Sequence, residues 1–367
     1  MSDIANKLIR QSLKSLKPYE SARRLYAMAS ADEVDTAWLN ANENPFLPDI
    51  AVYPELFNRY PDFQPEPLIN GYANYANVTT DQVLATRGAD EGIELLIRTF
   101  CEVGESILIC PPTYGMYAIS AETCGVNVVA VPTDKDFQLD VDAIKQQLDK
   151  VKIVFICSPN NPTGQVVNRA DLVDIIEAAQ DKAIVVADEA YIEFCPQATV
   201  ANLLNDYDNL VVLRTLSKAF GLAGLRCGFT LAPEATINAL KKVIAPYPIS
   251  APVAQIASQS LGLTGLSWMQ EKVEILNQLK SEFINATQKW SFIERTYPSD
   301  TNFVLMKLSS AISAEQVINR FIENNMLLRN QSKQLGLTNT VRISIGDHDQ
   351  MNKAIKIFNQ INQELGQ

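Results

Sequence analysis

Seven short apolar runs between residues 83 and 232 alternate with segments of helical periodicity, and this alternation constrains the possible folds most strongly. Helical patterns such as Glu91–Phe100, Ala143–Leu148 and Asp171–Ala179 lie between the runs. Strands that alternate with helices predict a largely parallel sheet covered by helices on both faces. We therefore predict a large α/β domain whose seven-stranded, mainly parallel sheet has the strands Val83–Thr86, Ser106–Pro111, Asn127–Val131, Lys152–Ser158, Ala183–Asp188, Leu210–Leu216 and Cys227–Ala232.

The pattern changes after Pro252, where residues 253–290 form a long, mostly helical segment. Strands are then predicted at Asn302–Leu308 and Val341–Ile345, with helices at Ala314–Asn325 and His348–Leu365. This shorter span predicts a smaller α+β domain. Residues 1–45 show no sheet pattern, and we expect them to pack against the small domain. The predicted division is thus 1–45, 46–255 for the large domain and 256–367 for the small domain, with a continuous helix joining the two domains.

The charge balance argues against nucleic acid and membrane as partners. The chain has 31 basic and 42 acidic residues and a formal net charge of -11, which disfavours binding to a phosphate backbone or an anionic lipid surface. The N-terminus lacks the charged-then-apolar pattern of a signal peptide, and no stretch has the roughly 18 apolar residues of a spanning helix. A cytoplasmic location is therefore expected.

Histidine and cysteine usage excludes several kinds of catalytic site. His348 is the only histidine, and it precedes a helical pattern, where a solvated or capping role is expected. The six cysteines are scattered without a Cys-x-x-Cys pair, which is typical of free thiols, most of them in apolar runs. We predict no metal site, and we expect lysine, carboxylate or tyrosine to carry any proton transfer.

Polar residues follow several predicted strands at the sheet edge where ligands of parallel α/β proteins bind. Arg87–Gly92 follows the first strand and opens a helix whose free N–H groups suit a phosphate. Ser158–Gly164 is a turn stiffened by two prolines. Asp188 ends an apolar run, where a buried carboxylate needs a cationic partner. Each feature alone is better explained as a polar turn or a structural carboxylate.

Lys218 follows the sixth predicted strand and is surrounded by small residues, which allow a flat or large ligand to approach. A lysine of lowered pKa forms Schiff bases with carbonyl compounds. Ser217 and Arg226 supply a hydroxyl and a guanidinium suited to a phosphate. Together the sites call for an aldehyde, a phosphate and a protonatable ring nitrogen, which pyridoxal 5'-phosphate combines.

The order of these parts resembles the fold-type-I, class-II pyridoxal-phosphate aminotransferases, and within them the histidinol-phosphate aminotransferase family of the enterobacterial type. The similarity extends from about Pro18 to Gly346 and is loosest in the first dozen residues and between Gly262 and Glu294. The motifs that carry it are Leu39–Pro45, Asn58–Pro61, Arg87–Glu94, Pro111–Tyr117, Ala187–Phe194, Thr215–Gly224 and Ala245–Pro248.

This resemblance implies a role for each residue of the cofactor site. Lys218 would bind the cofactor aldehyde and, once freed, move a proton from the substrate Cα to the cofactor. Asp188 would keep the ring nitrogen protonated, and Asn161 and Tyr191 would donate to the phenolic oxygen. Tyr114 would stack on the ring. The cofactor phosphate would be held by the backbone amides of Ala89 and Asp90, by Ser217 and Arg226, and by Tyr60 of the partner subunit.

The same resemblance implies the substrates and the assembly. The enzyme would exchange an amino group between L-histidinol phosphate and 2-oxoglutarate in histidine biosynthesis. Arg342 would bind the anion that both substrates carry, assisted for the phosphate by Arg329 and Tyr19, and Asn161 and Tyr60 would also contact the substrate. A homodimer follows if Tyr60 reaches the partner's site, although Tyr60 could instead pack between Pro54 and Pro61.

Four other functions remain to be weighed. An aromatic amino-acid aminotransferase or a decarboxylase of a phosphorylated amino acid would have a similar fold, and spacing in the sequence does not separate them. A cofactor-binding regulator without catalysis would need a DNA-binding module, and none precedes the enzyme-like pattern. A nucleotide-binding dehydrogenase is disfavoured because no Gly-x-Gly-x-x-Gly follows the first predicted strand.

Overall fold

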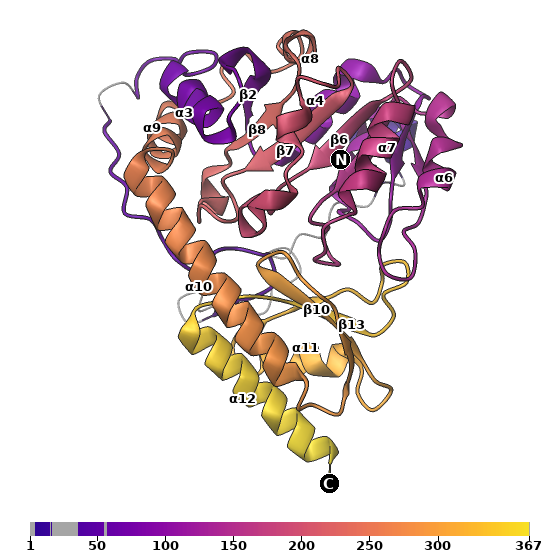
Figure 1. The fold of residues 1–367 in the computed structure, drawn as a ribbon, viewed down its shortest axis with the longest axis vertical. Helices are drawn as coiled ribbons and strands as arrows, with labels where there is room; N and C mark the ends of the chain where they lie inside the picture. Colours follow the sequence, from indigo (N-terminus) through magenta and orange to yellow (C-terminus); the bar gives the residue numbers. More distant parts are fainter. Residues whose placement is uncertain (1–3, 15, 17–35, 55–56, 367) are drawn as a thin grey trace.

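A computed structural model of the protein describes residues 4–14, 16, 36–54 and 57–366. Figure 1 shows two parts: a helix-covered sheet in the upper half, and below it a smaller sheet flanked by α11 (Ala314–Ile322) and α12 (His348–Leu365). The long helix α10 (Leu263–Thr287) runs from one part to the other.

The large sheet has seven strands in the order β2-β8-β7-β6-β5-β3-β4. All neighbours pair in parallel except β8, which is antiparallel to both β2 and β7. The predicted mainly parallel sheet is confirmed, with each strand within two residues of its expected bounds: β2 (Val83–Thr86), β3 (Ser106–Ile109), β4 (Asn127–Ala130), β5 (Ile153–Cys157), β6 (Ile184–Asp188), β7 (Leu210–Thr215) and β8 (Gly228–Leu231).

Successive side chains of these strands enter two different cores, because side chains alternate across a sheet. Phe155 and Val186 pack under α4 (Ala89–Phe100), α5 (Met116–Cys124) and α8 (Glu234–Leu240). Val154 and Ala187 pack on the other face, whose core continues into the small domain. The helices of that face are α3 (Glu66–Ala76), α6 (Val141–Lys145), α7 (Arg169–Ala178), α9 (Ala251–Ser260) and α10.

The small sheet has the order β12-β13-β10-β9, all antiparallel. Its central pair, β10 (Phe303–Leu308) and β13 (Thr340–Ser344), corresponds to the two predicted strands. The sequence did not predict β9 (Ile293–Thr296) or the two-residue strands β11 (Met326–Leu327) and β12 (Arg329–Asn330). Two residues are too few to show a period of two, and β9 carries polar side chains on an edge strand.

The helical segment predicted at residues 253–290 is two helices rather than one. It breaks at Leu261 and Gly262, and Gly262 takes an extended backbone conformation (φ -74°, ψ 167°) before α10 begins. Glycine is a poor helix former, and a second one follows three residues later. The Cβ of any other residue at Gly265 would lie 2.4 Å from the carbonyl oxygen of Ser260. The expected continuous helix between the domains is α10 alone.

The N-terminal region does contain a strand, contrary to expectation. β1 (Ala37–Trp38) pairs in parallel with β11, and the carbonyl of Leu39 accepts a hydrogen bond from the Ser344 N–H at 2.9 Å. Before it, residues 4–8 form α1 (Ile4–Leu8). The domain boundaries at residues 45 and 255 stay a prediction.

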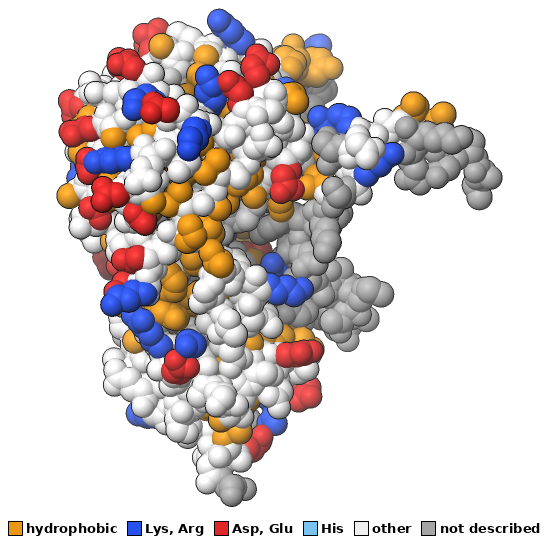
Figure 2. All heavy atoms as spheres, turned by 90° about the vertical axis from the view of Figure 1, so that its right-hand side faces the viewer, with side chains coloured by type: hydrophobic (Ala, Val, Ile, Leu, Met, Phe, Trp, Pro, Cys, Tyr) orange, Lys and Arg blue, Asp and Glu red, His pale blue; other side chains and the backbone are white. Residues whose placement is uncertain are grey.

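The charged surface residues, the cysteines and His348 lie as the sequence predicts. On the face shown in Figure 2, acidic and basic side chains are interspersed over the large sheet's end of the molecule. Within the described ranges, no helix is both long and apolar enough to cross a membrane. All six cysteines are free thiols, four of them buried, and His348 is exposed at the first turn of α12, as predicted.

Candidate active site

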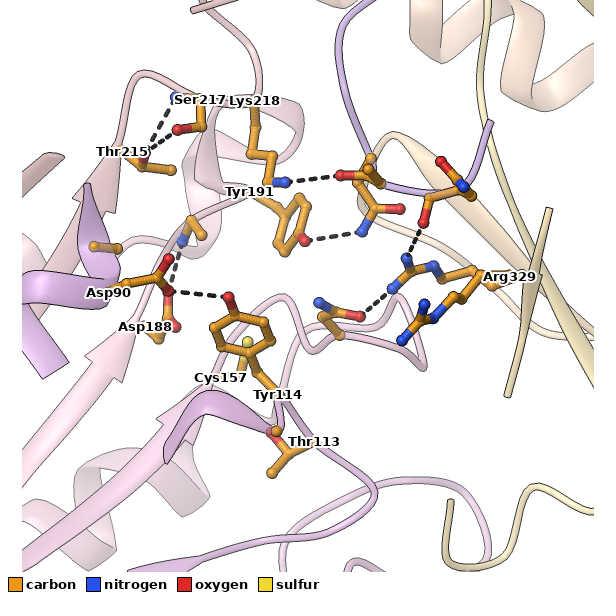
Figure 3. A pocket seen from close by; sticks show the side chains of 18 of the residues that line it. Asp90, Thr113, Tyr114, Cys157, Asp188, Tyr191, Thr215, Ser217, Lys218 and Arg329 are labelled. Carbon is orange, nitrogen blue, oxygen red and sulfur yellow. Dashed lines mark hydrogen bonds between the residues drawn. The ribbon is translucent and has the colours of Figure 1, made fainter. Parts of the chain in front are cut away.

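A cavity of about 380 Å³ lies where the chain leaves the carboxyl ends of β2, β3, β5, β6 and β7. The small domain and residues 40–42 close its other side. Figure 3 shows Lys218 and Tyr191 beside each other at the cavity, with Arg329 approaching from the opposite side. The cavity brings together eleven of the residues predicted from the sequence: Ala89, Asp90, Tyr114, Asn161, Asp188, Tyr191, Ser217, Lys218, Arg226, Arg329 and Arg342.

One end of the cavity has hydrogen-bond donors and a guanidinium that could hold an anion. The helix α4 begins at Ala89, and its first N–H groups have no partner within the helix. Arg226 Nη1 lies 3.4 Å from Ser217 Oγ, and its Nη2 lies 3.4 Å from the Asp90 carboxylate. This half-exposed ion pair contributes little to stability, so an incoming anion can compete for the guanidinium.

Gly88 and Gly228 allow this end to form. Gly88 caps α4 with φ of 81°, a left-handed conformation that few other residues adopt readily. At Gly228 a Cβ would lie 2.5 Å from the Ala89 nitrogen, so only glycine lets β8 pass so close to the start of α4. The start of β8 is thus packed directly against the N-terminus of α4.

Lys218 is partly buried and lines the cavity. Its Nζ donates to the Ala41 carbonyl at 3.1 Å and lies 5.7 Å from the centre of the Tyr191 ring. Burial, reinforced by the nearby positive charge of Arg342, lowers the pKa of Lys218 to about 8. A substantial fraction of the amine is therefore neutral near physiological pH and can act as a nucleophile or base.

Asp188 lies at the end of β6, with both carboxylate oxygens hydrogen bonded. Tyr117 donates to Oδ2 at 2.6 Å, and the Ala190 N–H donates to Oδ1 at 3.1 Å. Burial raises the pKa of Asp188 to about 6 despite these bonds. A cation placed against this carboxylate would favour its charged form. Tyr117 was missed as a site residue, although it ends the motif Pro111–Tyr117.

Tyr114 and Tyr191 line the cavity on different sides. Tyr114 donates from its hydroxyl to Asp90 Oδ1 at 2.9 Å and meets Tyr117 edge to face. The Tyr191 hydroxyl accepts from Asn42 Nδ2 at 2.9 Å, and burial raises its pKa above the ordinary range. Asn42, like Tyr117, was not predicted as a site residue, although it lies in the motif Leu39–Pro45.

Two arginines face the cavity from the small sheet, where Arg329 on β12 is paired with Arg342 on β13. Arg342 is buried, donates to Asn161 Oδ1 and to the Asn40 carbonyl, the latter at 3.0 Å, and lies 5.1 Å from the Phe303 ring centre. These contacts fix the guanidinium in place before any ligand arrives. The bond to Asn161 leaves that residue's Nδ2 as a donor for the cavity.

Two predicted site residues are not brought to this cavity. Tyr60 is 80% exposed and stacks on Tyr247, with ring centres 4.5 Å apart. It does not line the cavity of its own chain. Tyr19 lies outside the described residues.

Comparison with known proteins places these features in context. Residues 26–358 match the family model of class I and II aminotransferases. A histidinol-phosphate aminotransferase from Yersinia enterocolitica is 51% identical over 349 residues, which cover 95% of this chain and 91% of that protein.

Two solved structures share the fold over nearly their whole lengths. The histidinol-phosphate aminotransferase of Clostridium acetobutylicum has a TM-score of 0.81 at 26% identity and covers 89% of this chain and 99% of its own. The corresponding enzyme of Sinorhizobium meliloti, solved in complex with pyridoxal 5'-phosphate, has a TM-score of 0.84 at 21% identity, with 96% and 98% covered.

Proposed function

Because the chain belongs to the class I and II aminotransferase family, we propose that it exchanges an amino group between L-histidinol phosphate and 2-oxoglutarate, a step of histidine biosynthesis. One observation carries the proposal: a partly buried lysine of lowered pKa shares a cavity with donors suited to a phosphate on one side and Arg342 and Arg329 on the other. Relatives about half identical over most of their length, which carry this activity in their names, support the choice of substrate.

The residues present fit pyridoxal 5'-phosphate as the cofactor. The start of α4, Ser217 and Arg226 offer donors for a phosphate in a space that Gly228 keeps open. A neutral Lys218 amine suits an aldehyde. Asp188, whose buried carboxylate lacks a cationic partner among its hydrogen bonds, suits a protonated ring nitrogen. The bound cofactor supplies an aldehyde for the substrate amine and a ring that accepts electrons from Cα.

Each side chain around the cavity has its own role in the proposed reaction. Lys218, whose side chain lines the cavity, would take the proton from the substrate Cα and return it to the cofactor when pyridoxal 5'-phosphate is bound. Asp188 would hold the proton at the ring nitrogen. Asn161 and Tyr191 would donate to the phenolic oxygen, and the ring of Tyr114 would stack on the cofactor.

Arg342 binds the anionic group that differs between the two substrates. A guanidinium forms paired hydrogen bonds with a carboxylate or a phosphate, so one residue serves glutamate and histidinol phosphate in turn. Arg329, on the neighbouring strand, adds a second positive charge suited to the phosphate dianion. Tyr19 is the third residue that we propose for binding the substrate phosphate.

We also propose that the active unit is a cytoplasmic homodimer. Tyr60 is exposed and lies away from its own cavity, and its stack on Tyr247 holds it at the surface. In a dimer its hydroxyl would reach the phosphate of the partner's cofactor and the bound substrate. We retain the domain division at residues 45 and 255 as part of the proposal, with substrate bound between the large and small domains.

The direct test follows glutamate formation when the purified protein is mixed with pyridoxal 5'-phosphate, histidinol phosphate and 2-oxoglutarate. The cofactor absorption spectrum is recorded in the same experiment. We expect glutamate from the unmodified protein and none above background from Lys218→Ala. Lys280→Met is the matched control, because Lys280 is also buried, with its pKa lowered to about 8, but lies outside the cavity.

Other outcomes would redirect the proposal. Release of CO₂ without glutamate would indicate a decarboxylase, and turnover of aromatic amino acids with no reaction of histidinol phosphate would indicate an aromatic aminotransferase. A protein that never develops a cofactor absorption band would refute both the cofactor and the reaction.

A further inference from the structure

Asn42 lines the cavity and joins the two domains through hydrogen bonds. The residue is 1% exposed, and its Nδ2 donates to the Tyr191 hydroxyl of the large domain at 2.9 Å. On the other side its backbone N–H and its Oδ1 both contact Ser344 Oγ, at 2.8 Å and 3.1 Å. Asn302 Nδ2 donates to the Asn42 carbonyl at 3.0 Å. The positive φ of 55°, which asparagine tolerates well, permits this arrangement.

The chemistry of these groups fixes the direction of every hydrogen bond. A backbone N–H can only donate, so Ser344 Oγ is the acceptor of the Asn42 N–H and keeps its own hydrogen for another partner. That hydrogen goes to Asn42 Oδ1. The amide oxygen therefore faces Ser344 and the NH₂ group faces Tyr191.

The same logic sets the orientation of the Tyr191 hydroxyl. An amide NH₂ group donates and does not accept, so the Tyr191 oxygen is the acceptor in this pair. Among the described residues the hydroxyl forms no other hydrogen bond, and Tyr191 lines the cavity. Its hydrogen is thus left for an acceptor in the cavity.

We propose that Asn42 is a positioning residue that, together with Ser344, makes the Tyr191 hydroxyl a hydrogen-bond donor toward the ligand in the cavity. The identity of that ligand rests on the proposed function, in which the acceptor is the phenolic oxygen of the cofactor. The charged or titratable groups near the Tyr191 hydroxyl are Lys218, Arg342, Asp188 and Cys157, and Asn42 is the neutral group that binds it directly.

Reversing the polarity of this bond tests the proposal. In Asn42→Asp a carboxylate oxygen replaces the NH₂ group and accepts the hydrogen of the Tyr191 hydroxyl. Tyr191 would then no longer donate to the phenolic oxygen of the bound cofactor. The cofactor would hold its proton more tightly, so its pKa would rise. We expect the pH at which the absorption of the bound cofactor changes to rise by about one unit, a tenfold change in the ionisation constant. Ser344→Ala, which frees the amide to turn, is expected to give a smaller rise.

The added charge of Asn42→Asp is separated from the hydroxyl effect by repeating the measurement in Tyr191→Phe. We expect most of the rise to disappear in that background. A rise of equal size in both backgrounds would mean that the charge acts without Tyr191 and would overturn the proposal. Asn74→Asp, the same change at an exposed position of α3, is the control and is expected to leave the profile unchanged.

Urea unfolding of the cofactor-free protein tests the hydrogen bond between Asn42 and Tyr191 separately from cofactor binding. We expect Ser344→Ala to lower the urea midpoint of unfolding more in the native background than in Tyr191→Phe, because the amide then has no hydroxyl to hold. We expect Asn42→Asp to lower it less in the native background, because the Tyr191 hydroxyl donates to the new carboxylate and phenylalanine does not. Strictly additive losses would overturn the proposal whether or not the cofactor binds. If the unmodified protein shows no cofactor band but the losses are non-additive, the proposed function fails while the positioning of Tyr191 by Asn42 stands.

Discussion

Tyr117 donates its hydroxyl hydrogen to Asp188 Oδ2 at 2.6 Å, and both residues are buried beneath the cavity. The ring of Tyr117 is itself stacked on Phe155 of β5, with centres 4.9 Å apart. The carboxylate is therefore held by a side chain from α5 that is locked into the core. Burial raises the pKa of Asp188 to about 6 despite this hydrogen bond. A ligand that carries a positive charge against the carboxylate would lower this pKa and favour the charged form.

The first prediction concerns the stability of the cofactor-free protein against pH. Because the folded-state pKa of Asp188 is raised from 3.8 to about 6, its stabilising contribution is full below 3.8 and is lost as the pH rises through about 6. Tyr117→Phe removes a bond to the charged form, raises the pKa further and extends this loss above pH 6. Urea denaturation between pH 4 and 8 measures it, with Asp188→Asn as the reference. A Tyr117→Phe profile parallel to the native one would contradict the prediction.

The second prediction uses two glycines near Lys218. At Gly228 a Cβ would lie 2.5 Å from the Ala89 nitrogen, whereas at Gly224 no atom lies within 4 Å. Gly228→Ala should push the start of α4 away and weaken binding of pyridoxal phosphate at least about tenfold, the loss of one good hydrogen bond to a charged group. Gly224→Ala should bind nearly as well as the native protein. Fluorescence titration with the cofactor compares them, and equal affinities would refute this account of the anion site.

The third prediction links two positive side chains. Arg342 is the second cause, after burial, of the lowered pKa of Lys218. Arg342→Met should raise that pKa from about 8 toward 10.5, so that the neutral amine appears only at higher pH. Competitive labelling of Lys218 with acetic anhydride, followed by mass spectrometry across pH 6 to 11, measures the change. Arg329→Met is expected to shift it less, and an unchanged profile in Arg342→Met would show that burial alone sets the value.

The fourth prediction concerns the buried ion pair behind the site. Arg214 lies 2.8 Å from Glu189, with side chains 6% and 2% exposed. Removing one partner leaves a buried charge, so Arg214→Met should lower the free energy of unfolding by about 3–5 kcal/mol. Arg320→Met, which breaks the partly exposed contact with Glu364, should cost less than about 1 kcal/mol. Similar losses in chemical denaturation would argue against this difference.

The sequence predicts the large sheet well because its strands are buried on both faces. Runs such as Ile153–Cys157 are continuously apolar and end in polar residues at one edge, which is also where the ligand side chains gather. The neighbours of Lys218 are informative because small residues, a hydroxyl and a guanidinium lie close to it in sequence. The helix break at Gly262 was missed because apolar periodicity continues across it.

The contacts that orient the predicted residues could not be read from the sequence. Tyr117 and Asn42 lie 71 and 149 residues from their partners Asp188 and Tyr191. Neither spacing nor periodicity reports such distances along the chain, and both side chains look like ordinary core or turn residues. Arg329 and Arg342 become neighbours only through the register of β12 on β13, two strands of which one has no sequence signal.

Residues 40, 41 and 42 each touch a different functional side chain: Arg342, Lys218 and Tyr191 in that order. The first two contacts are made by backbone carbonyls, which every amino acid possesses, and only the third by a side chain. An alanine scan of this tripeptide would therefore detect Asn42 and leave the contacts to Arg342 and Lys218 intact. An ester after Asn40 weakens its carbonyl as an acceptor without altering any side chain and would reveal the contact to Arg342. An ester after Ala41 weakens the contact to Lys218 but also removes the Asn42 N–H that donates to Ser344 Oγ.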